Sequence, residues 1–97
     1  MNKQSITAEA ALLRQTLIKL RKDKKIHQSV IAKRLKRHQS YISKYENGEK
    51  NLDFIEVIQI CHALEVDPFQ LLSIYLDGLS KISLIETLYL KNQPSTN

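Results

Sequence analysis

The sequence predicts an all-α protein with five compact helices and one additional amphipathic helix at the C-terminal end. Apolar residues recur at spacings of three and four over nearly the whole chain, which is the period of a helix with one buried face. Only two glycines and two prolines interrupt the 97 residues. Because a chain of this length supports one modest hydrophobic core, we expect a single domain.

The first half of the chain contains three predicted helices. Thr7 can cap a helix that runs to about Lys22. Two short helices are expected over residues 28–36 and 39–47, and Gly48 can end the second of these because glycine readily adopts a positive φ. The residues expected to face the core are Leu13, Leu17 and Leu20 in the first helix and Ile31, Ala32 and Leu35 in the second.

The second half contains three further predicted helices. Asp53 can cap the fourth helix, and Asp67, followed by a proline at the first helical position, can cap a fifth over residues 68–76. The fifth helix should end near Gly78, and a last amphipathic helix is expected over residues 80–91. The fourth helix is expected to bury Phe54, Ile55, Ile58, Cys61 and Leu64.

Positive charge is concentrated in the middle of the chain. The formal net charge is +5, but residues 14–50 contain twelve Lys or Arg and three Asp or Glu, while the remainder sums to −4. A basic surface attracts polyanions such as nucleic acid or an anionic membrane, because neutralised phosphates release counterions. Ordinary solvated helix faces would account for part of this surplus.

The composition disfavours several classes of function. Cys61 is the only cysteine and no secretion signal or membrane-length apolar run is recognised, so we expect a cytoplasmic protein with no membrane partner. Cys61 and His62 point to different helix faces, and His27 and His38 fall in separate turns, so no metal site is expected. No phosphate loop, acid pair or activated nucleophile is visible, and Glu56 is interpreted as a surface residue. We therefore expect no enzyme activity, no cofactor and no small-molecule ligand.

The third predicted helix places hydrogen-bonding side chains on one face. At 100° per residue five polar residues fall within an arc of about 140°, whereas Tyr41, Ile42 and Tyr45 lie on the other side. A helix fits the major groove of B-DNA, where glutamine can bond adenine and lysine can reach guanine. A solvated surface is the alternative interpretation of this arc. It comprises Gln39, Ser40, Ser43, Lys44 and Asn47, of which the first four are predicted to contact bases.

The helices over residues 28–47 belong to a longer pattern. It includes Gln28, Ala32, Leu35, Gln39, Ile42, Ser43, the triplet ENG at 46–48 and the stretch LDFIEVIQICHALEVDPFQLL. In this pattern residues 17–72 resemble the phage-repressor and Cro-like helix-turn-helix family, also called XRE-type regulators. The resemblance implies a lambda-repressor-like fold that binds double-stranded DNA.

The resemblance also implies roles for individual residues. In the family, the glutamine that opens the second helix binds a DNA phosphate and braces the glutamine that opens the recognition helix, which implies these roles for Gln28 and Gln39. Asn47 matches a position that holds the DNA backbone, and Lys50 is close enough in sequence to do likewise. Ala32 matches a small residue at a close crossing of the two helices.

Arg21 and Glu46 match a pair that in relatives forms a partly buried ion pair between the first and third helices. We expect this structural role because an unpaired buried charge is costly. A phosphate contact by Arg21 is the alternative. Loss of either residue should destabilise the helix-turn-helix without changing the DNA sequence that it prefers.

Two features depart from the family pattern. The turn between the two short helices carries Lys36 where glycine is common, and His27 and His38 stand where serine or threonine caps are common. A non-glycine residue at positive φ costs on the order of 1 kcal/mol, which leaves room for a reshaped turn. Lys36 and Arg37 are then candidates for phosphate contacts. Tyr41, at the edge of the apolar arc, can either pack or donate its hydroxyl to a phosphate.

The C-terminal helix is a candidate for dimerisation. One recognition helix reads only a few base pairs, and relatives gain affinity by placing two heads one helical turn, about 34 Å, apart. We expect a homodimer whose contacts come from this end of the chain, although the same residues could fold back as extra core. The predicted interface comprises Leu72, Leu76, Leu79, Ile82, Ile85 and Tyr89.

These features predict a DNA-binding domain over residues 1–78 that contains the helix-turn-helix at 28–47. A loose arm is expected over residues 1–6, a dimerisation helix over 79–91 and a disordered tail over 92–97. The predicted function is that of a transcription regulator that reads an inverted-repeat operator as a dimer.

Several alternatives share part of this pattern. An antitoxin or a restriction-modification controller would carry the same DNA-binding head, although the short polar tail offers little room for binding a toxin. A protein-interaction adaptor would lack the base-reading chemistry of Gln28, Gln39 and Lys44. An RNA-binding protein would need more aromatic side chains for base stacking than Tyr41 alone.

Overall fold

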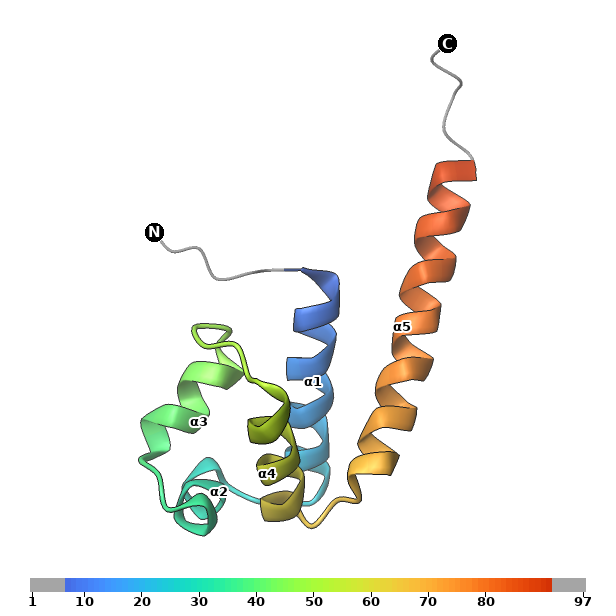
Figure 1. Ribbon diagram of the computed structural model, residues 1–97. Coiled ribbons are helices and arrows are strands. Elements are labelled where there is room, and N and C mark those ends of the chain that lie inside the picture. Colours follow the sequence, from blue (N-terminus) through green and yellow to red (C-terminus); the bar gives the residue numbers. More distant parts are fainter. Residues whose placement is uncertain (1–6, 92–97) are drawn as a thin grey trace.

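The computed structural model describes residues 7–91, and this range forms five helices without a strand (Figure 1). The predicted all-α class is confirmed, although six helices were expected. The arm at 1–6 and the tail at 92–97 lie outside the described residues. No helix between residues 7 and 91 is long and apolar enough to cross a membrane. The helices are α1 (Ala8–Asp23), α2 (Gln28–Leu35), α3 (Gln39–Glu46), α4 (Phe54–Leu64) and α5 (Pro68–Lys91).

α1, α4 and α5 begin where capping side chains predict, whereas His27 and His38 at the starts of α2 and α3 make no side-chain cap bond. The Thr7 hydroxyl accepts a hydrogen bond from the backbone N–H of Ala10 (3.1 Å). Asp53 and Glu56 form a reciprocal capping box at the start of α4, in which each carboxylate accepts from the backbone N–H of the other. The Asp67 carboxylate accepts from the N–H of Phe69 (2.9 Å). These local contacts fix where α1, α4 and α5 start.

The core lies where α1, α2, α3 and α4 meet. Its fully buried side chains include Leu17, Ile31, Ile42, Tyr45, Ile60, Cys61 and Leu64. The predicted burial of Phe54 and Ile55 is wrong, because these side chains are 78% and 66% exposed, whereas Ile60 is completely buried. Phe54 and Ile55 occupy the first turn of α4, and the buried face of this helix begins one turn later.

The predicted helix end near Asp77 and Gly78 is also wrong. α5 is one helix of 24 residues that runs through Gly78 and includes the expected last helix. Gly78 does not end the helix, and its lack of a side chain lets α5 pack closely against α1. A Cβ atom at this position would lie 3.1 Å from Cδ1 of Leu12 in α1. The Tyr75 hydroxyl adds a hydrogen bond to the carbonyl of Glu9 (3.1 Å). The first half of α5 therefore packs beside α1, and its second half extends past the other helices (Figure 1).

Candidate nucleic-acid interface

α2 and α3 form a helix-turn-helix on the side of the molecule away from α5 (Figure 1). α3 is anchored by Ile42 and Tyr45, which are buried in the core. Its opposite face presents polar side chains to solvent. The exposed residues on this face are Gln39, Ser40, Lys44 and Asn47, while Ser43 is half-buried. The polar arc predicted from the sequence therefore faces solvent, while the opposite face of α3 is held in the core.

The turn between α2 and α3 keeps the geometry for which glycine is common. Lys36 ends α2 with φ 58° and ψ 45°, which is the left-handed region. The N–H of Arg37 donates to the carbonyl of Ala32 (2.9 Å) and closes the turn. Lys36 thus adopts the left-handed conformation itself and accepts the backbone strain. The side chains of Lys36 and Arg37 are both exposed next to the start of α3.

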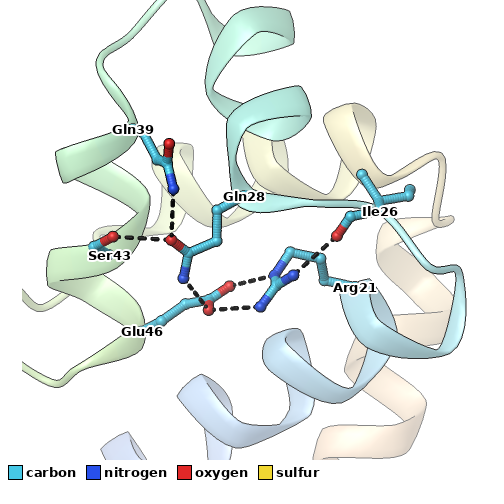
Figure 2. Close-up of polar contacts among 6 residues, drawn as sticks. All are labelled: Arg21, Ile26, Gln28, Gln39, Ser43 and Glu46. Carbon is cyan, nitrogen blue, oxygen red and sulfur yellow. Dashed lines mark hydrogen bonds and ion pairs between the residues drawn. The ribbon is translucent and has the colours of Figure 1, made fainter.

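Gln28 connects α2 to three positions of the helix-turn-helix (Figure 2). Its Nε2 donates to Oε1 of Glu46 at 2.7 Å. Its Oε1 accepts from Nε2 of Gln39 at 3.3 Å and from the hydroxyl of Ser43 at 2.9 Å. The contact between the two glutamines is the one implied by the family resemblance.

These bonds leave specific donors and acceptors for a ligand. Gln39 uses one of its two amide hydrogens, so one N–H and the carbonyl oxygen remain, which is the pair that adenine N7 and N6 require. Gln28 has both acceptor sites and one hydrogen engaged in these bonds, so one amide N–H remains. The Ser43 hydroxyl uses its hydrogen in the bond to Gln28, so its oxygen can only accept further hydrogen bonds.

A buried ion pair lies beneath this network (Figure 2). Arg21 Nε donates to Oε2 of Glu46 at 2.7 Å, and Arg21 Nη2 donates to Oε1 at 2.9 Å. Arg21 Nη1 also bonds the carbonyl of Ile26 (2.9 Å). Both charged residues are buried, so the expected pair between α1 and α3 is present and Arg21 does not lie on the surface.

A second polar cluster borders α3 on the side of α4. The Tyr41 hydroxyl donates to Oε2 of Glu56 (3.0 Å), and Nζ of Lys50 lies 3.3 Å from the same oxygen. The guanidinium carbon of Arg37 lies 4.2 Å above the Tyr41 ring. Burial and the hydrogen bond to Glu56 raise the pKa of the Tyr41 hydroxyl to about 12. Tyr41 therefore packs and donates within the protein at neutral pH.

Glu56 is the residue of this cluster that the sequence reasoning missed, because it was interpreted as a surface side chain. Its side chain is only 13% exposed. The spacing of Asp53 and Glu56 is that of a capping box and could have identified its structural part. The contacts with Tyr41 and Lys50 join residues separated by 15 and 6 positions, which no local pattern indicates.

The remaining candidates are distributed as follows. The backbone N–H of Asn47 bonds the carbonyl of Ser43 (2.8 Å), which leaves the exposed Asn47 side chain beside the end of α3. Within residues 7–91 no three His, Cys, Asp or Glu side chains come together as a metal site. In α5 the predicted interface residues Leu72, Leu76, Ile85 and Tyr89 are exposed, whereas Leu79 and Ile82 are half-buried.

Comparisons with known proteins agree on this architecture. Residues 17–71 match the profile of a helix-turn-helix family. An XRE-family-like protein from Pseudomonas syringae pv. tomato str. DC3000 is similar in structure, with TM-score 0.70, 38% identity, and coverage of 73% of this chain and 87% of that chain. The wild-type restriction-modification controller protein C.Esp1396I matches with TM-score 0.71 and 20% identity over 76% of this chain and 97% of its own.

The same controller bound to a 25-base-pair operator site gives TM-score 0.71 and 20% identity, with the same coverage of both chains. At this identity the similarity to the controller is one of fold. Comparison with curated protein sequences gives no match.

Proposed function

Since the chain belongs to the helix-turn-helix family of XRE-type DNA-binding regulators, we propose that it reads a short inverted-repeat operator as a homodimer and controls transcription in the cytoplasm. The observation that carries this proposal is the amide of Gln39, which is braced by Gln28 and still offers one donor and one acceptor. A preorganised side chain loses less freedom when it binds a base edge.

The exposed face of α3 supplies the base contacts. Gln39 bonds N6 and N7 of an adenine, and Lys44 reaches O6 or N7 of a guanine. Ser40 is exposed beside Gln39, and the Ser43 oxygen can accept from a cytosine or adenine amino group. These four residues read the half-site in this proposal.

The residues around α3 position the head on the DNA backbone. Gln28 donates its remaining N–H to a phosphate, and the exposed cations of the turn approach other phosphates of the DNA backbone. Such contacts add affinity for every sequence and make binding depend on salt. The proposed phosphate contacts come from Gln28, Lys36, Arg37, Tyr41, Asn47 and Lys50. For Tyr41 the contact requires that its hydroxyl exchange Glu56 for the phosphate.

The homodimer rests on the apolar surface of α5. A single α3 reads only a few base pairs, so two heads are needed for a selective site. The controller C.Esp1396I is described as a tetramer in complex with its natural 35-base-pair operator. In the present chain the exposed leucines and isoleucines of α5 would lie between two copies, with residues 79–91 as the dimerisation element. The proposed interface comprises Leu72, Leu76, Leu79, Ile82, Ile85 and Tyr89.

Selection of bound sequences from a random duplex pool at near-physiological salt tests this function. The expected result is an enriched inverted repeat with half-sites about 10 base pairs apart. A parallel pool of RNA hairpins should give no enrichment. A folded helical protein that enriches no duplex sequence would overturn the proposal.

A further inference from the structure

The Glu56 carboxylate is a negative charge set among the cations and donors that border α3. Its Oε1 accepts from the N–H of Asp53 (2.9 Å) and lies 3.4 Å from Nζ of Lys50. Its Oε2 accepts from the Tyr41 hydroxyl (3.0 Å) and lies 3.3 Å from the same Nζ. Three groups therefore make four contacts with one carboxylate at the start of α4.

The pairing changes what Lys50 can offer to DNA. Lys50 has no second carboxylate among the ion pairs formed by residues 7–91, and its side chain remains 37% exposed while that of Glu56 is 13% exposed. Lys50 Nζ also lies 5.8 Å from the centre of the Tyr41 ring. An ammonium group in this position is partly neutralised before any phosphate arrives, because the opposite charge is already at contact distance.

We propose that Glu56 withholds Lys50 from the DNA backbone and so lowers the sequence-independent part of DNA affinity. This inference rests on the proposed DNA-binding function and adds a residue whose charge opposes it. A phosphate that approaches Lys50 must displace the carboxylate or share the ammonium with it. The native contact of Lys50 with a phosphate is then weaker than that of an unpaired lysine.

The capping box allows the charge to be removed without removing the helix cap. Glutamine is accepted at the N3 position of a capping box, so the amide oxygen of Glu56→Gln can still accept from the N–H of Asp53. Its NH2 group then faces the Tyr41 hydroxyl, which can accept from it in place of donating. Asp53→Asn is the matched control, because asparagine caps as well as aspartate and the change removes an equal charge from the same end of α4 without touching Lys50.

The experiment is a salt titration of binding to a duplex of scrambled sequence, with wild type, Glu56→Gln, Asp53→Asn, Lys50→Ala and the Glu56→Gln/Lys50→Ala double variant. Thermal unfolding confirms that each variant is folded. One additional full phosphate contact steepens the slope of log K against log salt by about 0.9, which is roughly a 5- to 10-fold gain near 0.1 M salt. We expect this gain in Glu56→Gln and a smaller, general effect of charge removal in Asp53→Asn. Relative to Lys50→Ala, the double variant should gain no more than this smaller effect.

Lys50→Ala gives a second, independent readout. It should cost little in the wild-type background and much more in the Glu56→Gln background. Equal gains in Glu56→Gln and Asp53→Asn, a gain of undiminished size in the Lys50→Ala background, or weaker binding of Glu56→Gln would each overturn the inference. The scrambled duplex contains no operator, so this experiment does not depend on sequence preference. If the protein bound all sequences equally, the proposed regulator would be contradicted, and the effect of Glu56 on Lys50 could still be measured.

Discussion

The carboxylate of Glu46 meets the guanidinium of Arg21 through two hydrogen bonds, 2.7 and 2.9 Å long, and the same carboxylate holds the amide of Gln28. One buried anion thus connects α1, α2 and α3. We predict that Glu46→Ala lowers the free energy of unfolding by roughly 3–5 kcal/mol, because it leaves a buried guanidinium unpaired. Urea denaturation measures this loss.

Lys19→Ala is the control for this prediction, because it breaks the exposed pair between Lys19 and Asp23 and should cost only a few tenths of a kcal/mol. Equal losses in the two variants would contradict a structural role for Glu46. A Glu46 variant that remains folded should weaken binding to all duplexes alike, since it releases Gln28.

Gln39 is predicted to read a base, so Gln39→Ala should cost roughly 1–3 kcal/mol on the selected operator and leave scrambled DNA nearly unaffected. Fluorescence anisotropy with both duplexes measures the difference. Gln15→Ala, at an exposed position of α1, is the matched control and should change neither affinity. Equal losses on both duplexes would remove Gln39 from base readout.

Lys36 stores strain in the turn before α3. Lys36→Gly relieves its positive φ but adds freedom to the unfolded chain, so we expect a net stabilisation of roughly 0.5 kcal/mol. Glu65→Gly, at the left-handed residue that ends α4, should stabilise to a similar extent. Only Lys36→Gly should weaken DNA binding and flatten its salt dependence. Thermal unfolding that shows a lower melting temperature for Lys36→Gly would contradict the argument.

Glu56 makes the free energy of unfolding depend on pH in the acidic range. Burial raises the pKa of its carboxyl, but hydrogen bonds from the N–H of Asp53, the hydroxyl of Tyr41 and the ammonium of Lys50 outweigh burial and hold the pKa below the usual 4.5. The ionised carboxylate therefore stabilises the fold above the pKa of the unfolded chain, and this contribution is lost as pH falls through the lower folded value.

We predict that Glu56→Gln flattens the fall in unfolding free energy below about pH 4.5. Urea denaturation across the acidic range measures the slope, with Glu49→Gln as a control that removes a carboxylate from the loop before α4. A flattening of equal size in the two variants would rule out the contacts of Glu56 as its cause.

The local contacts of the fold could be predicted from the sequence. Thr7, Asp53 and Asp67 cap the helices that follow them. These caps were predictable because each bond joins residues only two or three positions apart. The ion pair of Arg21 with Glu46 spans 25 positions and became predictable only through the family resemblance. The base and phosphate contacts remain predictions.

Features that depend on neighbouring helices could not be predicted. Phe54 and Ile55 fit an apolar stripe, but the helices packed on α4 cover the face that contains Ile60. Gly78 resembles a helix end in the sequence, yet the approach of Leu12 from α1 gives it a place inside α5. Glu56 was missed because its partners come from another helix and from a loop.

The continuity of α5 has a consequence for the rate at which its backbone opens. Amide protons in its first half are protected by packing on α1 and α4, so they exchange with deuterium through larger openings of the domain. Its last turns carry the exposed Leu84, Ile85, Leu88 and Leu90, so they open by fraying from the C-terminal end of the helix. If a second copy covers this surface, exchange there slows as protein concentration rises, whereas exchange in α1 stays constant. The lifetime of these last turns is then set by the monomer–dimer equilibrium and not by the fold of the monomer.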